Sequence, residues 1–355
     1  MGVAIGDALG FPREGLDPRI AHRMFGRAPL KYRLLPGTGI YSDDTQLMLM
    51  AAQAILRSRS TWSAFRQSYL RRLAWFPLSL PIGAGRATIC AAFKSWFRYF
   101  GLPTGCRSAG NGPTTRAMLL TLAIHGTEHR TLKWIEDSTR LTHQDPLAVD
   151  GCQVLSKLTH IAASTRSKPL DPLDALQQAI ATSKELLLRD KLSDLAAFLQ
   201  AGRSPRAVAR HFGWEKGISG FIVPTTVMAC YCFLRYPNNF RSAVESAILL
   251  GGDADSVGGI VGGLVGAHIG YSALPQELAS RLLSLPHGQV WIEHLGERLS
   301  HWPHGVDDLH EAPPLPSEPL LQIVRNVFVI ALVAIHLLIR TPYWLSTRAK
   351  KKHRR

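Results

Sequence analysis

The stretch that decides the fold is AILLGGDADSVGGIVGGLVGAHIG, Ala247–Gly270. Its second half is apolar or small, and a glycine recurs there at every fourth residue, as on the packing face of a membrane helix. Asp253 and Asp255 stand directly in front of this half. A bilayer helix would need those charges held at one membrane face, with no basic flank to anchor it. We therefore predict a buried globular helix, whose glycines permit close packing and whose acids face a cation at its end.

The composition is that of a folded protein in a reducing compartment. The chain has 355 residues, of which 46% are hydrophobic and 19% charged, enough for a substantial core. The N-terminus lacks the basic region and long apolar stretch of a signal peptide. Five cysteines show no framework spacing, so we expect free thiols and a cytoplasmic protein. These cysteines are Cys90, Cys106, Cys152, Cys230 and Cys232.

The positive charge is concentrated at the C-terminus. The formal net charge is +15, and the last sixteen residues, RTPYWLSTRAKKKHRR, contain seven Arg or Lys and no acid. No base-stacking motif accompanies them, so we expect no specific nucleic-acid partner. An anionic membrane surface is the partner that this tail favours.

Helical periodicity is common and strand-like alternation is scarce, which predicts an all-α fold. We expect a compact multi-helix globule with its chemistry on the loops between helices. Asp43 or Asp44 is expected to cap the helix that follows, and Ser242 to stand at another helix start. The predicted helices are 45–56, 61–75, 116–124, 172–188, 224–234, 242–249 and 256–270.

The composition changes after residue 299. Residues 300–319 are rich in Pro, His and Asp and are typical of a solvated linker. Residues 320–339 are long and apolar enough to span a bilayer, with a snorkelling arginine and the basic tail on the cytoplasmic side. An interfacial amphipathic helix and a helix packed on the core remain alternatives. The polar residues of this helix, which share one narrow stripe, are Gln322, Arg325, Asn326, His336 and Arg340.

Two short segments far apart in the sequence share one layout. YSDDTQ at Tyr41–Gln46 and GGDADS at Gly251–Ser256 each carry two carboxylates and a hydroxyl in a turn before an apolar helix. Oxygen ligands of this kind suit Mg²⁺ or Mn²⁺, and two such turns could together hold a pair of ions. Each segment alone is more typical of a helix cap or an exposed acidic pair, and it is their shared layout that brings metal binding level with that interpretation. Spacing leaves both interpretations open.

Five motifs occur in a fixed order: GVAIGDALGFPRE, YSDDTQ, GNGPTTR, THQDP and LGGDADSVGGIVGGLVGAHIG. Together they resemble the ADP-ribosylglycohydrolase family, the dinitrogenase-reductase-activating and ADP-ribosyl-acceptor hydrolases. The resemblance covers residues 2–299, and we take 1–299 as the catalytic domain, followed by the linker 300–319 and the helix and tail 320–355. It implies an all-α globule with a binuclear magnesium or manganese centre. It also implies hydrolysis of the bond between ADP-ribose and an acceptor, which releases ADP-ribose.

The resemblance assigns roles by position. Asp255 or Asp44 would take the proton of the attacking water. Glu14 matches an acidic residue on a mobile loop by the metals and could assist or gate entry, whereas Asp7 looks structural. The metal ligands would be Ser42, Asp43, Asp44, Asp253, Asp255 and Ser256. The residues around ADP-ribose would be Gly85, Gly110, Asn111, Gly112, Thr114 and His143.

Two departures from the family pattern affect these expectations. Ser42 and Ser256 stand where family members frequently have Thr, and serine lacks the β-branch that fixes the rotamer, so we expect a looser ligand. A membrane-tethered ADP-ribose-binding module without catalysis is therefore an alternative. So is a hydrolase of another nucleotide bond on the same fold. We expect a monomer that acts on an ADP-ribosylated protein or small molecule, with the acceptor left open among arginine, serine, a nucleic-acid end and a metabolite.

Overall fold

The computed structural model describes residues 1–355 except 59–60, 125–126, 167, 303–313, 317 and 353–355. The all-α prediction is confirmed, since the described residues form helices and isolated bridges but no strand. The first nine helices are α1 (Gly2–Gly10), α2 (Pro18–Phe25), α3 (Asp43–Leu56), α4 (Trp62–Trp75), α5 (Arg86–Lys94), α6 (Thr114–Ala123), α7 (Glu128–Arg140), α8 (Pro146–Ser164) and α9 (Pro172–Thr182). The next are α10 (Leu186–Ser193), α11 (Leu195–Gln200), α12 (Pro205–His211), α13 (Ile222–Arg235), α14 (Phe240–Ile248), α15 (Ala254–Ile269), α16 (Gln276–Ala279), α17 (Gln289–Ser300) and α18 (Pro319–Lys352). Short 3₁₀ turns are η1 (Phe11–Arg13), η2 (Phe76–Ser79), η3 (Ser95–Phe100) and η4 (Tyr271–Ala273).

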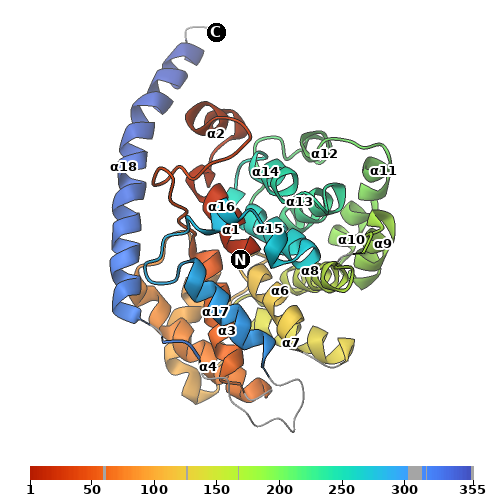
Figure 1. The fold of residues 1–355 in the computed structure, drawn as a ribbon, viewed down its shortest axis with the longest axis vertical. Coiled ribbons are helices and arrows are strands. Elements are labelled where there is room, and N and C mark those ends of the chain that lie inside the picture. Colours follow the sequence, from red (N-terminus) through yellow and green to blue (C-terminus); the bar gives the residue numbers. More distant parts are fainter. Residues whose placement is uncertain (59–60, 125–126, 167, 303–313, 317, 353–355) are drawn as a thin grey trace.

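Helix α15 lies at the centre of the globule, beside α1, α8, α13 and α14 (Figure 1). Nearly all of its residues are buried, which confirms a globular helix and not a membrane span at this position. Its glycines face those of α1 so closely that the two backbones touch. A Cβ atom built on Gly6 would lie 2.1 Å from the carbonyl oxygen of Gly258. Only glycine permits this approach, and it places the start of α15 next to α1.

Most of the predicted helices are present within a few residues of their expected ends, but the helix predicted at 172–188 is wrong as a single element. Helix α9 ends at Thr182 and α10 begins at Leu186. The carboxylate of Asp150 accepts hydrogen bonds from Ser183 Oγ (2.6 Å) and the backbone N–H of Lys184 (2.8 Å). These bonds stabilise a non-helical turn that local periodicity does not reveal.

The predicted helix starts are also corrected. Ser42, and neither aspartate, is the N-cap of α3, because its Oγ accepts the backbone N–H of Asp44 at 3.3 Å. At α14 the cap is Asn239, whose Oδ1 accepts the N–H of Ser242 at 2.9 Å. In both cases the true cap precedes the expected one.

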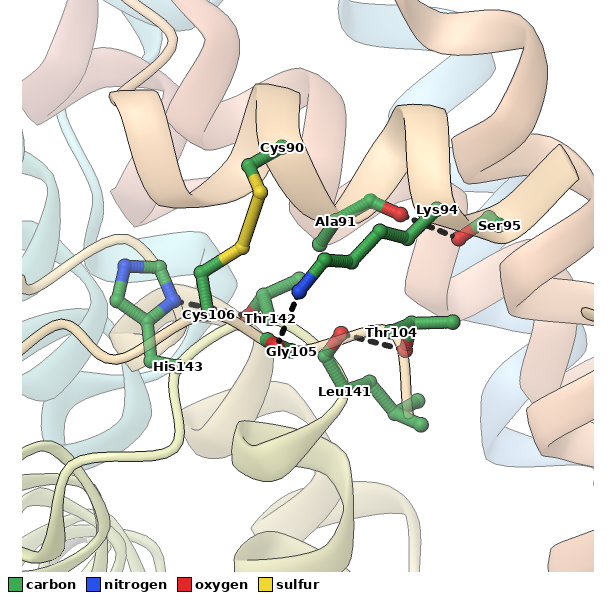
Figure 2. Close-up of a disulfide and its surroundings, with 10 residues drawn as sticks. All are labelled: Cys90, Ala91, Lys94, Ser95, Thr104, Gly105, Cys106, Leu141, Thr142 and His143. Atoms are coloured by element: carbon green, nitrogen blue, oxygen red, sulfur yellow. Dashed lines mark hydrogen bonds between the residues drawn. A yellow bond between two sulfur atoms is a disulfide. The ribbon is translucent and has the colours of Figure 1, made fainter. Parts of the chain in front are cut away.

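The expectation of free thiols is wrong for two of the five cysteines. Cys90 on α5 is disulfide-bonded to Cys106 in the loop before α6, sixteen residues along the chain (Figure 2). The other three cysteines are free and buried. The bond joins a helix to a loop that lines the cleft described below.

Helix α18 runs along the outside of the globule and extends beyond it (Figure 1). Of the described residues, 319–338 form the one helix long and apolar enough to cross a membrane by length and composition. In the stretch predicted as a linker, Trp302 and Leu315 are buried, and residues 303–313 and 317 lie outside the described residues.

Candidate active site

Two acid-bearing turns meet at one end of a cleft of about 530 Å³. Asp43 and Asp44 open α3, and Asp253 and Asp255 stand at the start of α15. All four carboxylates line the cleft. The two turns are in direct contact, because the hydroxyl of Ser256 donates to Asp44 Oδ2 at 2.5 Å. Segments about two hundred residues apart therefore share one site.

Asp7 holds the first turn in place from α1. Its carboxylate accepts hydrogen bonds from the backbone N–H of Ser42 (2.7 Å), the N–H of Thr45 (3.2 Å) and the hydroxyl of Thr45 (2.5 Å). Asp7 is fully buried and does not line the cleft. Its contacts are those of a structural acid that fixes the turn through hydrogen bonds.

The second turn depends on two glycines in the left-handed region. Gly251 and Gly252 have φ of +74° and +75°, which disfavours any residue with a Cβ. The N–H of Gly252 donates to Leu16 O (2.9 Å), and that of Asp253 to Ile218 O (2.7 Å). A Cβ on Gly252 would lie 2.1 Å from Ile218 O. The turn therefore packs tightly between the loops that contain Leu16 and Ile218, and this packing fixes the orientation of Asp253 and Asp255.

Glu14 reaches the cleft from the loop after α1. It is half-buried and lines the cleft with the aspartates. The next residue is tied to the second turn, since Gly15 N–H donates to Gly252 O at 2.8 Å. The loop that the family resemblance describes as mobile is held at this point by the turn that carries Asp253.

The aspartates lie in a strongly unfavourable electrostatic environment. Burial raises the pKa of Asp43, Asp44 and Asp255 well above the ordinary range, and repulsion from the neighbouring carboxylates raises each further. Burial also raises the pKa of Asp253, against a lowering by the Asn111 amide. No Lys, Arg or His in the described part of the chain forms an ion pair with any of the four. Burial of like charges without a counter-ion is energetically unfavourable, so these carboxylates require a bound cation or must be protonated.

The donor chemistry of this set fits a hard divalent cation. Only oxygen donors are present, and Asp255 Oδ1 is buried without a hydrogen-bond partner among the described residues. Such an atom is available as a ligand. No group of three or more His, Cys, Asp or Glu side chains in the described ranges is arranged to hold an ion. The fit is therefore one of donor type and burial, and not of a formed coordination sphere.

Another wall of the cleft, in contact with the aspartates, is made of glycine-containing loops. Of the residues expected around ADP-ribose, Gly85, Gly110, Asn111, Gly112 and His143 line it. The amide of Asn111 donates to Asp253 Oδ2 (2.5 Å) and to Thr225 Oγ1 (3.0 Å), so it ties this wall to the acid end. Glycine leaves main-chain groups open to a ligand, as a phosphate or sugar requires.

His143 is a neutral imidazole at this wall. Burial, followed by the charge of Arg116, lowers its pKa to about 3. Its Nδ1 lies 2.9 Å from Thr142 Oγ1, beside the disulfide (Figure 2). Cys106 N–H donates to Thr142 O at 3.0 Å, so the disulfide-bonded loop and the His143 loop are joined. Neutral His143 can offer one hydrogen bond to a ligand without adding charge.

Comparison with known proteins identifies this architecture. A model of the ADP-ribosylglycohydrolase family matches residues 1–307. The chain belongs to this family. ADP-ribosylarginine hydrolase Tri1 of Serratia proteamaculans is 27% identical over 313 residues, 84% of this chain and 77% of that protein. The ADP-ribosyl-[dinitrogen reductase] glycohydrolase of Rhodospirillum rubrum is 25% identical over 79% of this chain and 88% of its own. A solved structure, an ADP-ribosylglycohydrolase-related protein complex, superposes with a TM-score of 0.60 at 26% identity, and covers 85% of this chain and 95% of its own.

Two residues assigned by the family resemblance lie behind the cleft of this ADP-ribosylglycohydrolase and not on its surface. Thr114 is 1% exposed at the start of α6, and its N–H donates to Asn111 O at 3.0 Å. Ser42 is buried as the cap of α3. Ser256 does line the cleft, and its hydroxyl is fixed by Asp44. Hydrogen bonds thus hold both serines in the way that a β-branch would hold threonine.

Several residues that line the cleft are not among those expected around ADP-ribose. Gly83 has φ of +93°, and a Cβ there would lie 2.6 Å from Asp43 Oδ1. Gly85 of the same loop was the residue expected near the ligand, and the approach of Gly83 to Asp43 depends on a backbone conformation that the sequence does not specify. A Cβ on Gly220 would lie 3.3 Å from Asp253 Oδ2. The remaining additions are Arg86, Thr88, Ser108 and Ser219.

Proposed function

We propose that this ADP-ribosylglycohydrolase cleaves the glycosidic bond between ADP-ribose and an acceptor, releases ADP-ribose and depends on a pair of Mg²⁺ or Mn²⁺ ions. The observation that carries the proposal is the meeting of Asp44 and Ser256 at one end of the cleft, with buried carboxylates around them. The cleft volume of about 530 Å³ is within the range of small-molecule and cofactor sites.

The acidic and the glycine-rich parts of the cleft lining suit different parts of the substrate. The acid end would hold the cations by Asp43, Asp44, Asp253, Asp255 and Ser256, whereas Ser42, behind the cleft, would support the turn as the cap of α3. Bound there, the ions would supply Lewis-acid polarisation of the ribose hydroxyls and of a water molecule. The glycine-rich wall around Gly110 and Gly112 would bind the diphosphate through main-chain N–H groups, with neutral His143 beside it.

Asp255 is the favoured base. Asp44 Oδ2 already accepts the Ser256 hydroxyl, whereas Asp255 Oδ1 has no partner among the described residues. The raised pKa of a buried carboxyl also favours proton acceptance near neutral pH. Asp255 would take one proton from water as the water oxygen bonds to the anomeric carbon. The bond from that carbon to the acceptor breaks, and the acceptor atom keeps the electron pair and gains the proton that Asp255 took from the water.

Arginine is the acceptor that we propose first. Tri1, which is named for ADP-ribosylarginine, aligns over 84% of this chain. A second Tri1, from Pseudomonas putida, is also 27% identical over 84% of this chain. The similarity to two hydrolases named for ADP-ribosylarginine supports an arginine-linked substrate.

The test incubates the purified full chain with arginine-linked and serine-linked ADP-ribosyl proteins, in Mg²⁺, in Mn²⁺ and in chelator. We expect chelator-sensitive release of free ADP-ribose, faster from arginine, and its loss in Asp255→Asn. Asp171→Asn is the matched control, since Asp171 caps α9 away from the cleft and Asn caps a helix equally well. ADP-ribose binding without turnover would show a binding module instead. A product other than ADP-ribose would show a hydrolase of another bond.

A further inference from the structure

Helix α18 is amphipathic, but its polar residues face the protein and its apolar residues face outward, the reverse of an ordinary surface helix. Arg325 and Asn326 are 2% and 1% exposed. The guanidinium of Arg325 donates to the carbonyl of Tyr41, and its Cζ atom lies 4.6 Å from the centre of the Tyr41 ring. Asn326 Nδ2 donates to Ser79 O at 2.7 Å. Further along the helix, His336 Nε2 lies 2.9 Å from Leu34 O.

The outward face of α18 is apolar. At 100° per residue the exposed residues centre on the side opposite to Arg325 and Asn326. Within residues 319–338 the one charged side chain is Arg325, which is buried. The exposed apolar residues are Leu320, Leu321, Val324, Val327, Phe328, Ile330, Ile335, Leu337 and Leu338. A continuous apolar stripe of this length on a monomer marks an interaction surface.

More apolar side chains adjoin the N-terminal end of α18. Ser79, the partner of Asn326, belongs to η2, and the side chains around it point to solvent. Trp75, Leu78 and Leu80 are 67%, 48% and 47% exposed. Exposed Trp beside an apolar helix is typical of surfaces that enter the lipid headgroup region.

The docked polar stripe argues against a membrane span for α18 in this arrangement. Contacts at Arg325 and His336 are eleven residues apart, or about 16 Å of helix held against the globule. To span a membrane, α18 would have to leave the globule, and the carbonyls of Tyr41 and Ser79 would lose their hydrogen-bond donors. The helix can instead lie parallel to a membrane, with its outer face in the lipid and its inner face on the protein.

We propose that the outer face of α18, with Trp75, Leu78 and Leu80, binds the interface of an anionic lipid bilayer, so that the enzyme is a peripheral membrane protein. Charge decides between lipid and a second copy of the chain as the occupant. The last sixteen residues carry seven Arg or Lys and no acid, and the whole chain has a formal charge of +15. Two such chains repel each other, whereas anionic headgroups attract the tail.

The test measures sedimentation of the purified full chain with vesicles. One set contains phosphatidylcholine alone and the other an equimolar mixture of phosphatidylcholine and phosphatidylserine. We expect binding to the mixed vesicles that high salt weakens, and at least about tenfold weaker binding for the triple variant Val324→Gln, Phe328→Gln and Ile335→Gln. The matched control, Leu186→Gln, Leu187→Gln and Val290→Gln, changes equally exposed apolar residues elsewhere and should bind as the wild type does. Circular dichroism checks that both variants fold.

Three results would overturn the proposal. Equal binding to both vesicle types would show that binding does not depend on anionic lipid. Resistance of membrane-bound protein to alkaline carbonate extraction would show a span. A wild-type dimer in size exclusion that the triple variant abolishes, together with no vesicle binding, would show a second copy on this face. None of these measurements depends on ADP-ribosyl hydrolysis, so failure here is distinguishable from failure of the proposed function.

Discussion

The contact between α1 and α15 predicts that one methyl group will separate the two helices. In Gly6→Ala the new Cβ would lie 2.1 Å from Gly258 O and 2.6 Å from Gly258 C, both backbone atoms that cannot rotate away. An ordinary contact of about 3.4 Å or more requires the backbones to part by roughly 1.3 Å. Overpacking of a core costs about 1–3 kcal/mol, while alanine returns up to about 1 kcal/mol of helix propensity. We expect a net loss of about 2 kcal/mol in the free energy of unfolding.

The same face of α15 supplies the matched control. A Cβ on Gly266 meets nothing closer than 3.6 Å, an ordinary contact with Gly2. Gly266→Ala should therefore stabilise the protein by about 0.5–1 kcal/mol, through helix propensity alone. Urea denaturation followed by circular dichroism measures both variants, with the slope checked for two-state behaviour. A Gly6→Ala protein as stable as the wild type, or two variants that change in the same direction, would contradict this prediction.

Four further predictions follow from the site. Asp255→Asn should lower kcat by at least about 100-fold in the ADP-ribosyl-arginine assay, as for loss of a general base; unchanged turnover would move that role to Asp44. In the folded protein the pKa of His143 is about 3, below its ordinary 6.5, so the folded state binds fewer protons than the unfolded state. The free energy of unfolding should therefore decrease by up to about 1.4 kcal/mol for each unit that the pH is lowered between 6.5 and 3. Urea denaturation at several pH values should show a weaker dependence of stability on pH for His143→Gln. Cys106→Ser opens a sixteen-residue loop and should cost about 3 kcal/mol in non-reducing buffer, with no difference from wild type after reduction. Arg325→Leu should leave the Tyr41 carbonyl unpaired, cost about 1–3 kcal/mol and weaken Mn²⁺ binding measured by calorimetry, whereas equal Mn²⁺ affinity would limit α18 to stability.

The elements that could be predicted are those whose signal is local. Periodicity alone located α3, α4 and α13, because each buries a continuous apolar face. The glycine spacing of α15 identified a close-packed helix, and the acids before it excluded a bilayer. The pairing of the two acidic turns came from their shared layout and from the family resemblance, since no local pattern records which distant turns meet.

What could not be predicted depends on partners far along the chain. The break after Thr182 is made by Asp150, thirty-three residues before Ser183. The disulfide pairs two cysteines whose proximity follows from the fold of the loop before α6. Gly83 approaches Asp43 because of a positive φ, which its sequence context permits but does not specify.

Helix α18 shows how one sequence pattern permits more than one interpretation. Its polar stripe was located from periodicity, but hydropathy compares water with a uniform apolar medium and takes no account of protein carbonyls as partners. Arg325 and Asn326 find such partners in Tyr41 and Ser79, so they need not snorkel. An apolar helix with a stripe of this kind therefore predicts a protein neighbour on one side and leaves lipid for the other.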